Sequence, residues 1–239
     1  MASVRYSPNQ LLASLPSADF ELLRPHLRPF KLERPTVLFF ADDPITRVYF
    51  PHSGIISLVV ELAGGDMIEA AMVGRDGVVG ATSALIGDTA LSTAIVQHPG
   101  TASILDIEAH RTAAEQSVAY RTMLIQNFEA LFVQAQQSAA CNASHTIRCR
   151  LSRWLLRVRD LTDSDMFPMT QELLAQMLGV RRMSVSSAAK RLQHDGLIRC
   201  QHRKIEITDL DGLIRSSCEC YGKVKGHYDK LLHNIIIRN

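Results

Sequence analysis

The sequence changes character abruptly near residue 107. Between residues 36 and 107, short β-branched and aromatic segments alternate with Gly, Pro and Asp turn signals, a spacing typical of an antiparallel barrel or roll. Residues 108–162 contain no Gly and no Pro, which predicts two helices in succession. Together these patterns indicate an α+β chain. Strands are expected over residues 36–40, 47–50, 55–62, 67–72, 92–97 and 102–107, after short helices over residues 7–28.

The first long helix, expected over residues 116–145, carries more apolar residues than one buried face needs. Leu124, Phe128, Leu131 and Ala135 follow one another at spacings of four, three and four, which is a heptad-like seam. Neighbouring apolar side chains add a second stripe, and a helix that is apolar on two sides needs two partners. We therefore expect one face to pack on the roll and the seam to pair with a second copy of the chain.

Residues 169–192 carry a helix-turn-helix pattern. The first helix follows Thr170, a favoured N-cap residue, and Gly179 suits the tight turn, since a left-handed backbone is cheap only for glycine. The second helix begins near Arg182 and is expected to turn two opposite faces inward and outward. The inward residues are Val185, Ala188, Ala189 and Leu192, and the outward residues are Arg182, Met183, Ser186, Ser187 and Lys190. Residues 197–207 then predict a β-hairpin with a basic tip, which is a wing.

A second helix of this size fits the major groove of DNA, with its N-terminal residues at the base edges. Arg182 can bind guanine bidentately, serine hydroxyls allow close approach to phosphates or bases, and the amides that begin the first helix suit a phosphate. A basic wing adds salt-dependent affinity. The predicted DNA-binding residues are Thr170, Gln171, Arg182, Met183, Ser184, Ser186, Ser187, Lys190, Arg203 and Lys204.

The distribution of charge supports a polyanion partner for the C-terminal half. The whole chain has a formal net charge of only +2. Residues 1–146 contain 9 Lys and Arg against 14 Asp and Glu, a net charge of −5, whereas residues 147–239 contain 17 against 10, a net charge of +7. A basic half joined to an acidic half suggests that only one of them meets nucleic acid.

The composition excludes several classes of protein. With 46% hydrophobic and 21% charged residues, the chain is neither disordered nor fibrous. No apolar run approaches the roughly 20 residues of a membrane span, and residues 1–6 show no secretory signal, so we expect a cytoplasmic protein without a membrane partner. The chain has no G-x-S-x-G motif, no H-E-x-x-H motif and no convincing carboxylate pair, so we expect no enzyme.

All five cysteines lie in the C-terminal half, and an odd number without a secretory signal favours reduced thiols. Cys141, His145 and Cys149 share one helical face but span about 12 Å, so at most two of them could share an ion. Cys218 and Cys220 are expected in one helix, about 200° apart, where both cannot face an ion unless the helix breaks. We predict no metal ligand and no cofactor, and the role of these cysteines stays open.

A β-roll, a long helix and a winged helix-turn-helix in this order resemble the Crp/Fnr superfamily of bacterial transcription regulators. The resemblance covers nearly the whole chain and is strongest over residues 146–207, with a second region over residues 46–80. It implies a cyclic-nucleotide-binding-like sensor domain (an antiparallel double-stranded β-helix) at 1–115, a dimerisation helix at 116–145 and a winged helix-turn-helix domain at 146–239. It also implies a homodimer that binds a near-palindromic operator in double-stranded DNA and contacts RNA polymerase.

The chain departs from the nucleotide-binding members of that superfamily at the expected effector pocket. Where those members carry Gly-Glu-Leu and then Arg-Ser-Ala, this chain has Gly80-Ala81-Thr82 and Leu91-Ser92-Thr93. The resemblance assigns the Glu to the ribose hydroxyl and the Arg to the cyclic phosphate. A buried phosphate without its cation is badly desolvated, so we predict that cyclic AMP is not bound in the usual way and leave the effector unknown. The effector pocket is expected at Gly80, Ala81, Leu91, Ser92 and Thr93.

Two further departures concern other members of the superfamily. The iron–sulfur members carry an N-terminal cysteine cluster, whereas the first cysteine here is Cys141. On the recognition helix, Met183 stands where the nucleotide-binding type has a base-contacting Glu, and Ser187 replaces its second Arg, so the operator sequence is expected to differ. Two other interpretations stay open: a sensor or scaffold protein with a vestigial helix-turn-helix, and a thiol- or metal-responsive regulator.

Overall fold

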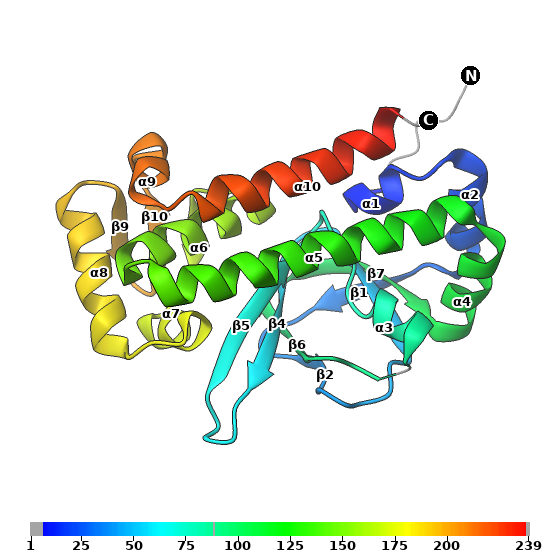
Figure 1. Cartoon of the computed structure of the whole chain (residues 1–239), viewed down its shortest axis with the longest axis horizontal. Helices are drawn as coiled ribbons and strands as arrows, with labels where there is room; N and C mark the ends of the chain where they lie inside the picture. The colour runs from blue at the N-terminus through cyan, green and yellow to red at the C-terminus, as the bar shows by residue number, and fades with distance from the viewer. Residues whose placement is uncertain (1–6, 88, 238–239) are drawn as a thin grey trace.

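Two antiparallel sheets in the N-terminal half enclose a core between them and form the predicted β-roll (Figure 1). One sheet has the strand order β1-β7-β3, and the other has the order β2-β6-β4-β5. The computed structural model describes residues 7–87 and 89–237, with side chains as far as residue 232; residues 1–6, where we expect no secretory signal, lie outside it. The strands are β1 Arg28–Leu32, β2 Val37–Phe39, β3 Arg47–Pro51, β4 Ile55–Glu61, β5 Met67–Val73, β6 Thr93–His98 and β7 Gly100–Asp106.

Strand β1 is the one element of these two sheets that the sequence pattern missed. Its segment Arg28-Pro-Phe-Lys-Leu contains no β-branched residue, so its local strand signal is weak. The strand forms because β7 offers a continuous partner, from Arg28 opposite Ile104 to Leu32 opposite Gly100, and because Leu32 is buried in the roll. Pairing in the folded chain thus overrides local propensity.

The stretch without Gly and Pro forms three helices instead of the two expected. They are α4 (Ile107–Gln116), α5 (Val118–Ser144) and α6 (Ile147–Thr162). Polar residues in extended backbone separate them: the Ser117 hydroxyl accepts a hydrogen bond from an amide in the first turn of α5 at 2.9 Å, and Thr146 caps α6. A side chain that caps the first turn therefore begins a new helix even where the sequence contains no Gly or Pro. None of the helices described is long and apolar enough to cross a membrane.

Shorter helices flank the roll and cover its ends. The predicted short helices before the roll are present, which confirms that expectation, and another helix follows Gly80 at the end of the β5 connection. Their bounds are α1 Gln10–Ala13, α2 Ser17–Leu23, the 3-10 helix Arg24–His26 and α3 Ala81–Ile86.

The C-terminal part contains the predicted helix-turn-helix and wing, followed by two helices where one was expected. The wing is a sheet with the order β8-β10-β9. The last helix, α10, runs back along α5 (Figure 1), and its Val224, Tyr228 and Leu231 join the core of α5 and the N-terminal helices. Helix α10, which belongs to the expected unit 146–239, thus packs on α5 as well as on α6. The elements are β8 Met166–Pro168, α7 Gln171–Leu178, α8 Arg182–His194, β9 Ile198–Gln201, β10 Lys204–Ile207, α9 Leu210–Ser216 and α10 Cys220–Ile237.

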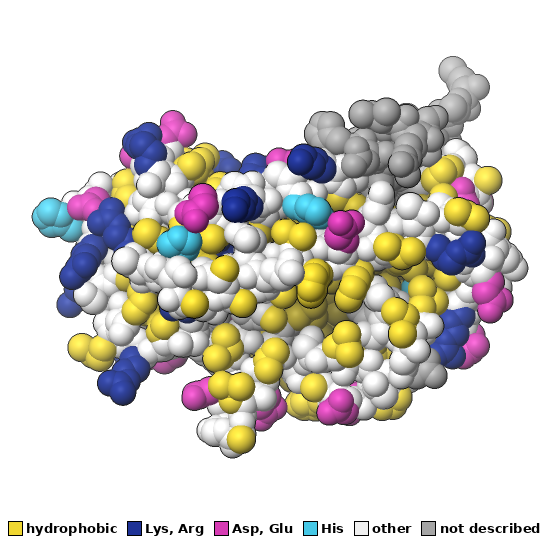
Figure 2. Space-filling model, in the orientation of Figure 1, with side chains coloured by type: hydrophobic (Ala, Val, Ile, Leu, Met, Phe, Trp, Pro, Cys, Tyr) yellow, Lys and Arg dark blue, Asp and Glu magenta, His cyan; other side chains and the backbone are white. Residues whose placement is uncertain are grey.

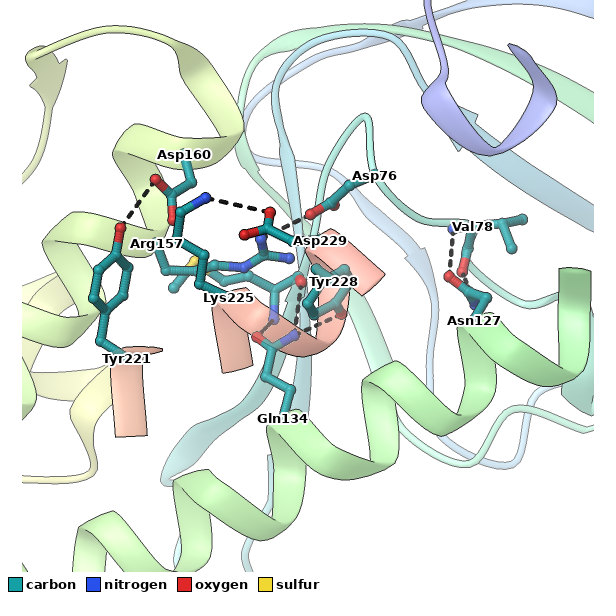
Figure 3. Close-up of polar contacts among 11 residues, drawn as sticks. Asp76, Val78, Asn127, Gln134, Arg157, Asp160, Tyr221, Lys225, Tyr228 and Asp229 are labelled. Carbon is teal, nitrogen blue, oxygen red and sulfur yellow. Dashed lines mark hydrogen bonds and ion pairs between the residues drawn. The ribbon is translucent and has the colours of Figure 1, made fainter. Parts of the chain in front are cut away.

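Buried polar side chains join the roll to α5, α6 and α10 (Figure 3). Arg157 of α6 donates a hydrogen bond at 2.7 Å to Asp76 in the loop after β5, and these side chains are only 8% and 9% exposed. The Arg157 guanidinium lies 4.2 Å from the centre of the Tyr228 ring, and the Tyr228 hydroxyl accepts a hydrogen bond from Gln134 at 2.9 Å. Gln134 also binds the backbone N–H and C=O of Met72 on β5. One network thus holds four segments that are far apart in the sequence.

A buried carboxyl group makes a second link between the halves. Glu69 of β5 accepts hydrogen bonds from the Trp154 indole of α6 at 2.8 Å and from the Ser57 hydroxyl of β4 at 2.5 Å. Burial raises the pKa of Glu69 from 4.5 to about 7, because the low-polarity interior disfavours the charged form. The folded state therefore binds this proton more tightly than the unfolded state. The resulting stability is complete below pH 4.5 and is lost as the pH rises through about 7.

We predict that Glu69→Gln stabilises the protein above pH 7 by about 3 kcal/mol and changes little near pH 4.5. The amide keeps both contacts, since its oxygen accepts from Trp154 and its N–H donates to Ser57, and it cannot ionise. Urea unfolding at the two pH values measures the effect. Glu61→Gln, at an exposed position on the same hairpin, is the control, and identical pH profiles for Glu69→Gln and the parent would contradict the buried-proton account.

Candidate functional site

The turn between α7 and α8 has the geometry that the sequence predicted. Thr170 caps α7, and its hydroxyl accepts a hydrogen bond from the Leu173 amide at 3.2 Å. Gly179 ends α7 with a φ of +60°, a left-handed backbone that glycine adopts without strain. Val185 and Leu192 of α8 are fully buried, so the opposite face of α8 is turned to solvent.

The outer face of α8 presents side chains that we expected to contact DNA. Arg182, Met183, Ser187 and Lys190 are all exposed, and Met183 is 78% exposed although it is apolar. Ser184, in the first turn of the helix, is half-buried. The face therefore combines two cations, a hydroxyl and an apolar side chain that could contact a thymine methyl group.

Two of the predicted DNA-binding residues, Ser186 and Arg182, interact with other residues of the helix-turn-helix. The Ser186 hydroxyl donates a hydrogen bond to the Gln171 side chain at 2.5 Å, so Ser186 turns toward α7 and not outward as we expected. Arg182 forms an ion pair with Glu172 at 2.9 Å, and both side chains are mostly exposed. Exposed ion pairs contribute about 1 kcal/mol or less, so a phosphate or a guanine edge can replace Glu172 as the partner of Arg182.

A groove of about 410 Å³ lies between the helix-turn-helix and the wing. Thr170, Gln171 and Arg182 line it together with Arg203 and Lys204 of the wing. The wing turns through left-handed backbone, with a φ of +62° at Arg203, as short hairpins require. Residues that are far apart in the sequence thus form one concave basic surface.

The β4–β5 hairpin of the roll packs against the turn of the helix-turn-helix. A Cβ atom on Gly179 would lie 3.1 Å from the Ile68 side chain, so these surfaces are in close contact. Beside this contact, a cavity of about 700 Å³ is lined by Asp66 of the hairpin and by Arg181 and Ser184 at the start of α8. The roll therefore touches α7 and the turn that leads into α8, a contact that no local sequence pattern reveals.

A cavity of about 200 Å³ opens on the roll at the expected effector pocket. Gly80, Ala81, Leu91 and Ser92 line it. Thr93 lies outside the lining: it is buried, and its hydroxyl accepts a hydrogen bond at 3.0 Å from a backbone amide of the loop after β2. None of the described side chains that line this cavity is charged.

One wall of this cavity is formed by α5. Phe128, Leu131, Phe132 and Ala135 contribute to the lining, and three of these four belong to the predicted dimer seam. Leu131 and Ala135 are half-buried there. The cavity and the outward face of α5 therefore share side chains.

The position of α3 at the cavity floor depends on a histidine that no motif indicated. The His110 Nε2–H donates a hydrogen bond to the Ala81 carbonyl at 2.9 Å, and Nδ1 accepts one from the Tyr120 hydroxyl at 2.8 Å. Burial lowers the pKa of His110 to about 4, so the ring is neutral. His110 thus ties α4, α5 and the start of α3 together.

The outward face of α5 is apolar and shares Phe128 with the predicted seam, but it exposes Ile125 and Phe132 in place of the neighbouring Leu124 and Leu131. Leu124 is only 1% exposed because it belongs to the core of its own chain, whereas Ile125 is 66% exposed. Phe128 and Phe132 are also exposed and stack with their ring centres 6.4 Å apart. Figure 2 shows hydrophobic side chains gathered along this face. Periodicity alone did not decide which of two adjacent stripes packs on the roll.

Cys141, His145, Cys218 and Cys220 meet at the C-terminal end of α5. One potential ligand atom from each lies within 4.8 Å of the others. Cys218 and Cys220 both reach this place because α9 ends at Ser216 and α10 begins only at Cys220. We predicted no metal ligand on the assumption of one unbroken helix, and this break removes the assumption.

Two family models match the chain. One is described as a cyclic nucleotide-binding domain and matches residues 29–117, over the roll; the other is described as a Crp-like helix-turn-helix domain and matches residues 149–216. The chain belongs to the Crp/Fnr superfamily of transcription regulators. Both the resemblance and the α+β fold class predicted from the sequence are thereby confirmed. No curated protein matches the chain.

Solved structures of this superfamily share the fold. FixK2 from Bradyrhizobium japonicum matches with a TM-score of 0.70 at 19% identity, covering 80% of this chain and 98% of its own. A putative Crp/Fnr-family regulator from Eubacterium rectale matches with a TM-score of 0.68 at 16% identity, and the match covers 86% of this chain and 96% of that chain. The c-di-GMP-responsive global regulator CLP from Xanthomonas campestris matches with a TM-score of 0.66 at 17% identity, and the match covers 81% of this chain and 100% of that chain.

Proposed function

We propose that this Crp/Fnr-type regulator binds a near-palindromic operator in double-stranded DNA as a homodimer, with one α8 helix in each major groove. The proposal places the protein in the cytoplasm, with RNA polymerase as a further partner, and assigns it no catalytic reaction. The observation that carries it is the exposed face of α8, where Arg182, Ser187 and Lys190 adjoin a groove that the basic wing completes. Surfaces of this kind read base edges with the helix and bind phosphates with the wing.

Pairing along α5 is supported by the apolar side chains that this helix exposes. Val118, Ile125, Phe128 and Phe132 are between 42% and 68% exposed. Their spacings of seven, three and four residues are those of a coiled-coil seam. Exposed apolar surface of this extent marks an interaction site, and a self-complementary helix face suits a two-fold dimer. Such a dimer presents two α8 helices to two half-sites.

An effector other than a cyclic nucleotide is supported by the chemistry of the cavity on the roll. Its described lining holds no cation to neutralise a phosphate, and Leu91 is 79% exposed at the position of the family's arginine. The volume of about 200 Å³ is also below the usual range for ligand pockets. We propose that any effector of this pocket is small and largely apolar, unlike c-di-GMP.

We predict that Arg182→Ser lowers affinity for the operator about 5- to 150-fold, since one bidentate base contact is worth about 1–3 kcal/mol. Fluorescence anisotropy measures this on a duplex obtained by binding-site selection with the parent protein. Arg24→Ser is the matched control, because Arg24 is 65% exposed and pairs with Glu21 much as Arg182, 64% exposed, pairs with Glu172. Equal binding by Arg182→Ser and the parent would favour a sensor or scaffold with a vestigial helix-turn-helix.

We predict that the double substitution Ile125→Glu and Phe132→Glu converts the dimer to a monomer, because it places like charges in the proposed seam. Analytical ultracentrifugation of the full chain measures the mass. Ile214→Glu, at an apolar position of α9 that is 40% exposed, should leave the dimer intact. Pairing along α5 is refuted if the parent sediments as a monomer or the double variant remains a dimer.

We predict that titration calorimetry of the parent with cyclic AMP, and separately with c-di-GMP, gives no saturable heat. A phosphate in the cavity would lose its hydration without gaining a cation. Because a ligand that binds the folded state raises the melting temperature, a thermal-shift assay provides an independent check. Micromolar binding of either nucleotide would overturn this part of the proposal.

A further inference from the structure

Four side chains with metal-binding atoms converge where α5 ends. Cys141 lies in the last turn of α5, and His145 is its C-cap residue. Cys218 lies in the break between α9 and α10, and Cys220 begins α10. All three thiols are buried and His145 is half-buried. Three sulfur atoms and one imidazole nitrogen lie within 4.8 Å of one another, and these are the number and type of donors that a tetrahedral zinc site uses.

We propose that Cys141, His145, Cys218 and Cys220 bind one zinc ion. The Sγ atoms of Cys141 and Cys218 are 3.5 Å apart, and Cys220 Sγ is 3.6 Å from His145 Nδ1. Bonds of about 2.3 Å to sulfur and about 2.0 Å to nitrogen at tetrahedral angles require separations of roughly 3.5–3.8 Å. Two edges of the tetrahedron therefore already lie within about 0.3 Å of the lengths that zinc requires, about 3.8 Å between two sulfur atoms and about 3.5 Å between sulfur and nitrogen. With four protein ligands the site is closed, which is typical of a structural zinc.

The second nitrogen of His145 supports this assignment. Its Nε2 lies 3.5 Å from the Glu219 carboxylate, so an Nε2–H directed at Glu219 leaves the Nδ1 lone pair facing Cys220. A ligating histidine commonly gives its other N–H to a carboxylate, which fixes the tautomer and raises the basicity of the ligand. Glu219 lies between Cys218 and Cys220 in the sequence. The segment 218–220 therefore supplies two proposed ligands and the carboxylate that orients His145.

The surrounding charges suit an anionic centre. Three thiolates and one Zn²⁺ leave a net charge of −1 once the thiols have released their protons to solvent. Arg150 and Arg153 of α6 interact electrostatically with Cys141. Their Nε atoms are buried and have no hydrogen-bond partner within the described part of the chain. A neighbouring anion compensates the positive charge of Arg150, which is buried, and of Arg153, which is half-buried.

The proposed site would fasten the end of α5 to the junction of α9 and α10. These segments are separated by more than seventy residues, and the cysteine cluster is otherwise small and isolated from the large cores. A metal would therefore join the helix that we propose as the dimer seam to the unit that carries α8. Cys149 packs against the cluster but is not among the four ligands, because its sulfur faces the Thr146 hydroxyl.

The experiment uses the full chain purified under reducing conditions. Native mass spectrometry should show one zinc per chain. After removal of zinc by a chelator, Co²⁺ should bind at one equivalent with the ligand-field absorption of tetrahedral thiolate coordination. Cys218→Ser and Cys220→Ser should each abolish this signal, whereas Cys149→Ser and Cys200→Ser should keep it. Circular dichroism verifies that each variant is folded.

Glu219→Gln gives a test that does not depend on losing a ligand. Glu219 is 67% exposed, so its substitution leaves the fold intact, and the Co²⁺ affinity should fall roughly 10- to 100-fold. The proposal is overturned if the folded parent binds neither Zn²⁺ nor Co²⁺, or if Cys218→Ser binds Co²⁺ as tightly as the parent. It is also overturned if mass spectrometry finds a Cys141–Cys218 disulfide and no bound metal ion. No DNA is present, so failure here is distinguishable from failure of the DNA-binding proposal.

Discussion

The buried ion pair between Arg157 and Asp76 is the contact on which the arrangement of the two halves depends (Figure 3). Two charges taken out of water at this depth are tolerated only together, and removing one partner of such a pair typically costs about 3–5 kcal/mol. The pair fixes α6 against the loop after β5, while Tyr228 and Gln134 bring α10 and α5 to the same point. Each element of this junction therefore constrains the others.

This junction determines where the recognition helix lies. Helix α6 forms the main core of the DNA-binding unit with Val185 and Leu192 of α8, and this core is continuous with Ile55 and Met72 of the roll. The hairpin residue Ile68 packs on the turn before α8. Helix α5 also forms a wall of the cavity on the roll and exposes the proposed dimer seam, so a movement of α5 would change both surfaces. Packed contacts of this kind can carry coupling between distant sites.

Local patterns in the sequence located the features that depend on neighbouring residues. The cap at Thr170, the left-handed Gly179 and the alternation of buried and exposed residues in α8 were all predictable, because turn and capping geometry are local. Strand β1, the extra break at Ser117 and the one-residue shift from Leu124 to Ile125 were not. Each of these depends on which surface the rest of the chain presents, and a single apolar stripe does not specify its partner.

The sequence by itself determined the superfamily, the order of elements and the helix-turn-helix, and it predicted that the residues that bind the ribose and the cyclic phosphate are replaced by Ala81 and Leu91. Only the tertiary structure decided that α10 returns to α5, that Arg157 meets Asp76 and that four metal-binding atoms converge at the end of α5. Motifs depend on spacing along the chain, which is readable directly. Contacts between Cys141 and Cys218 depend on where a helix breaks and on how distant elements pack, and these follow from the burial of the whole chain.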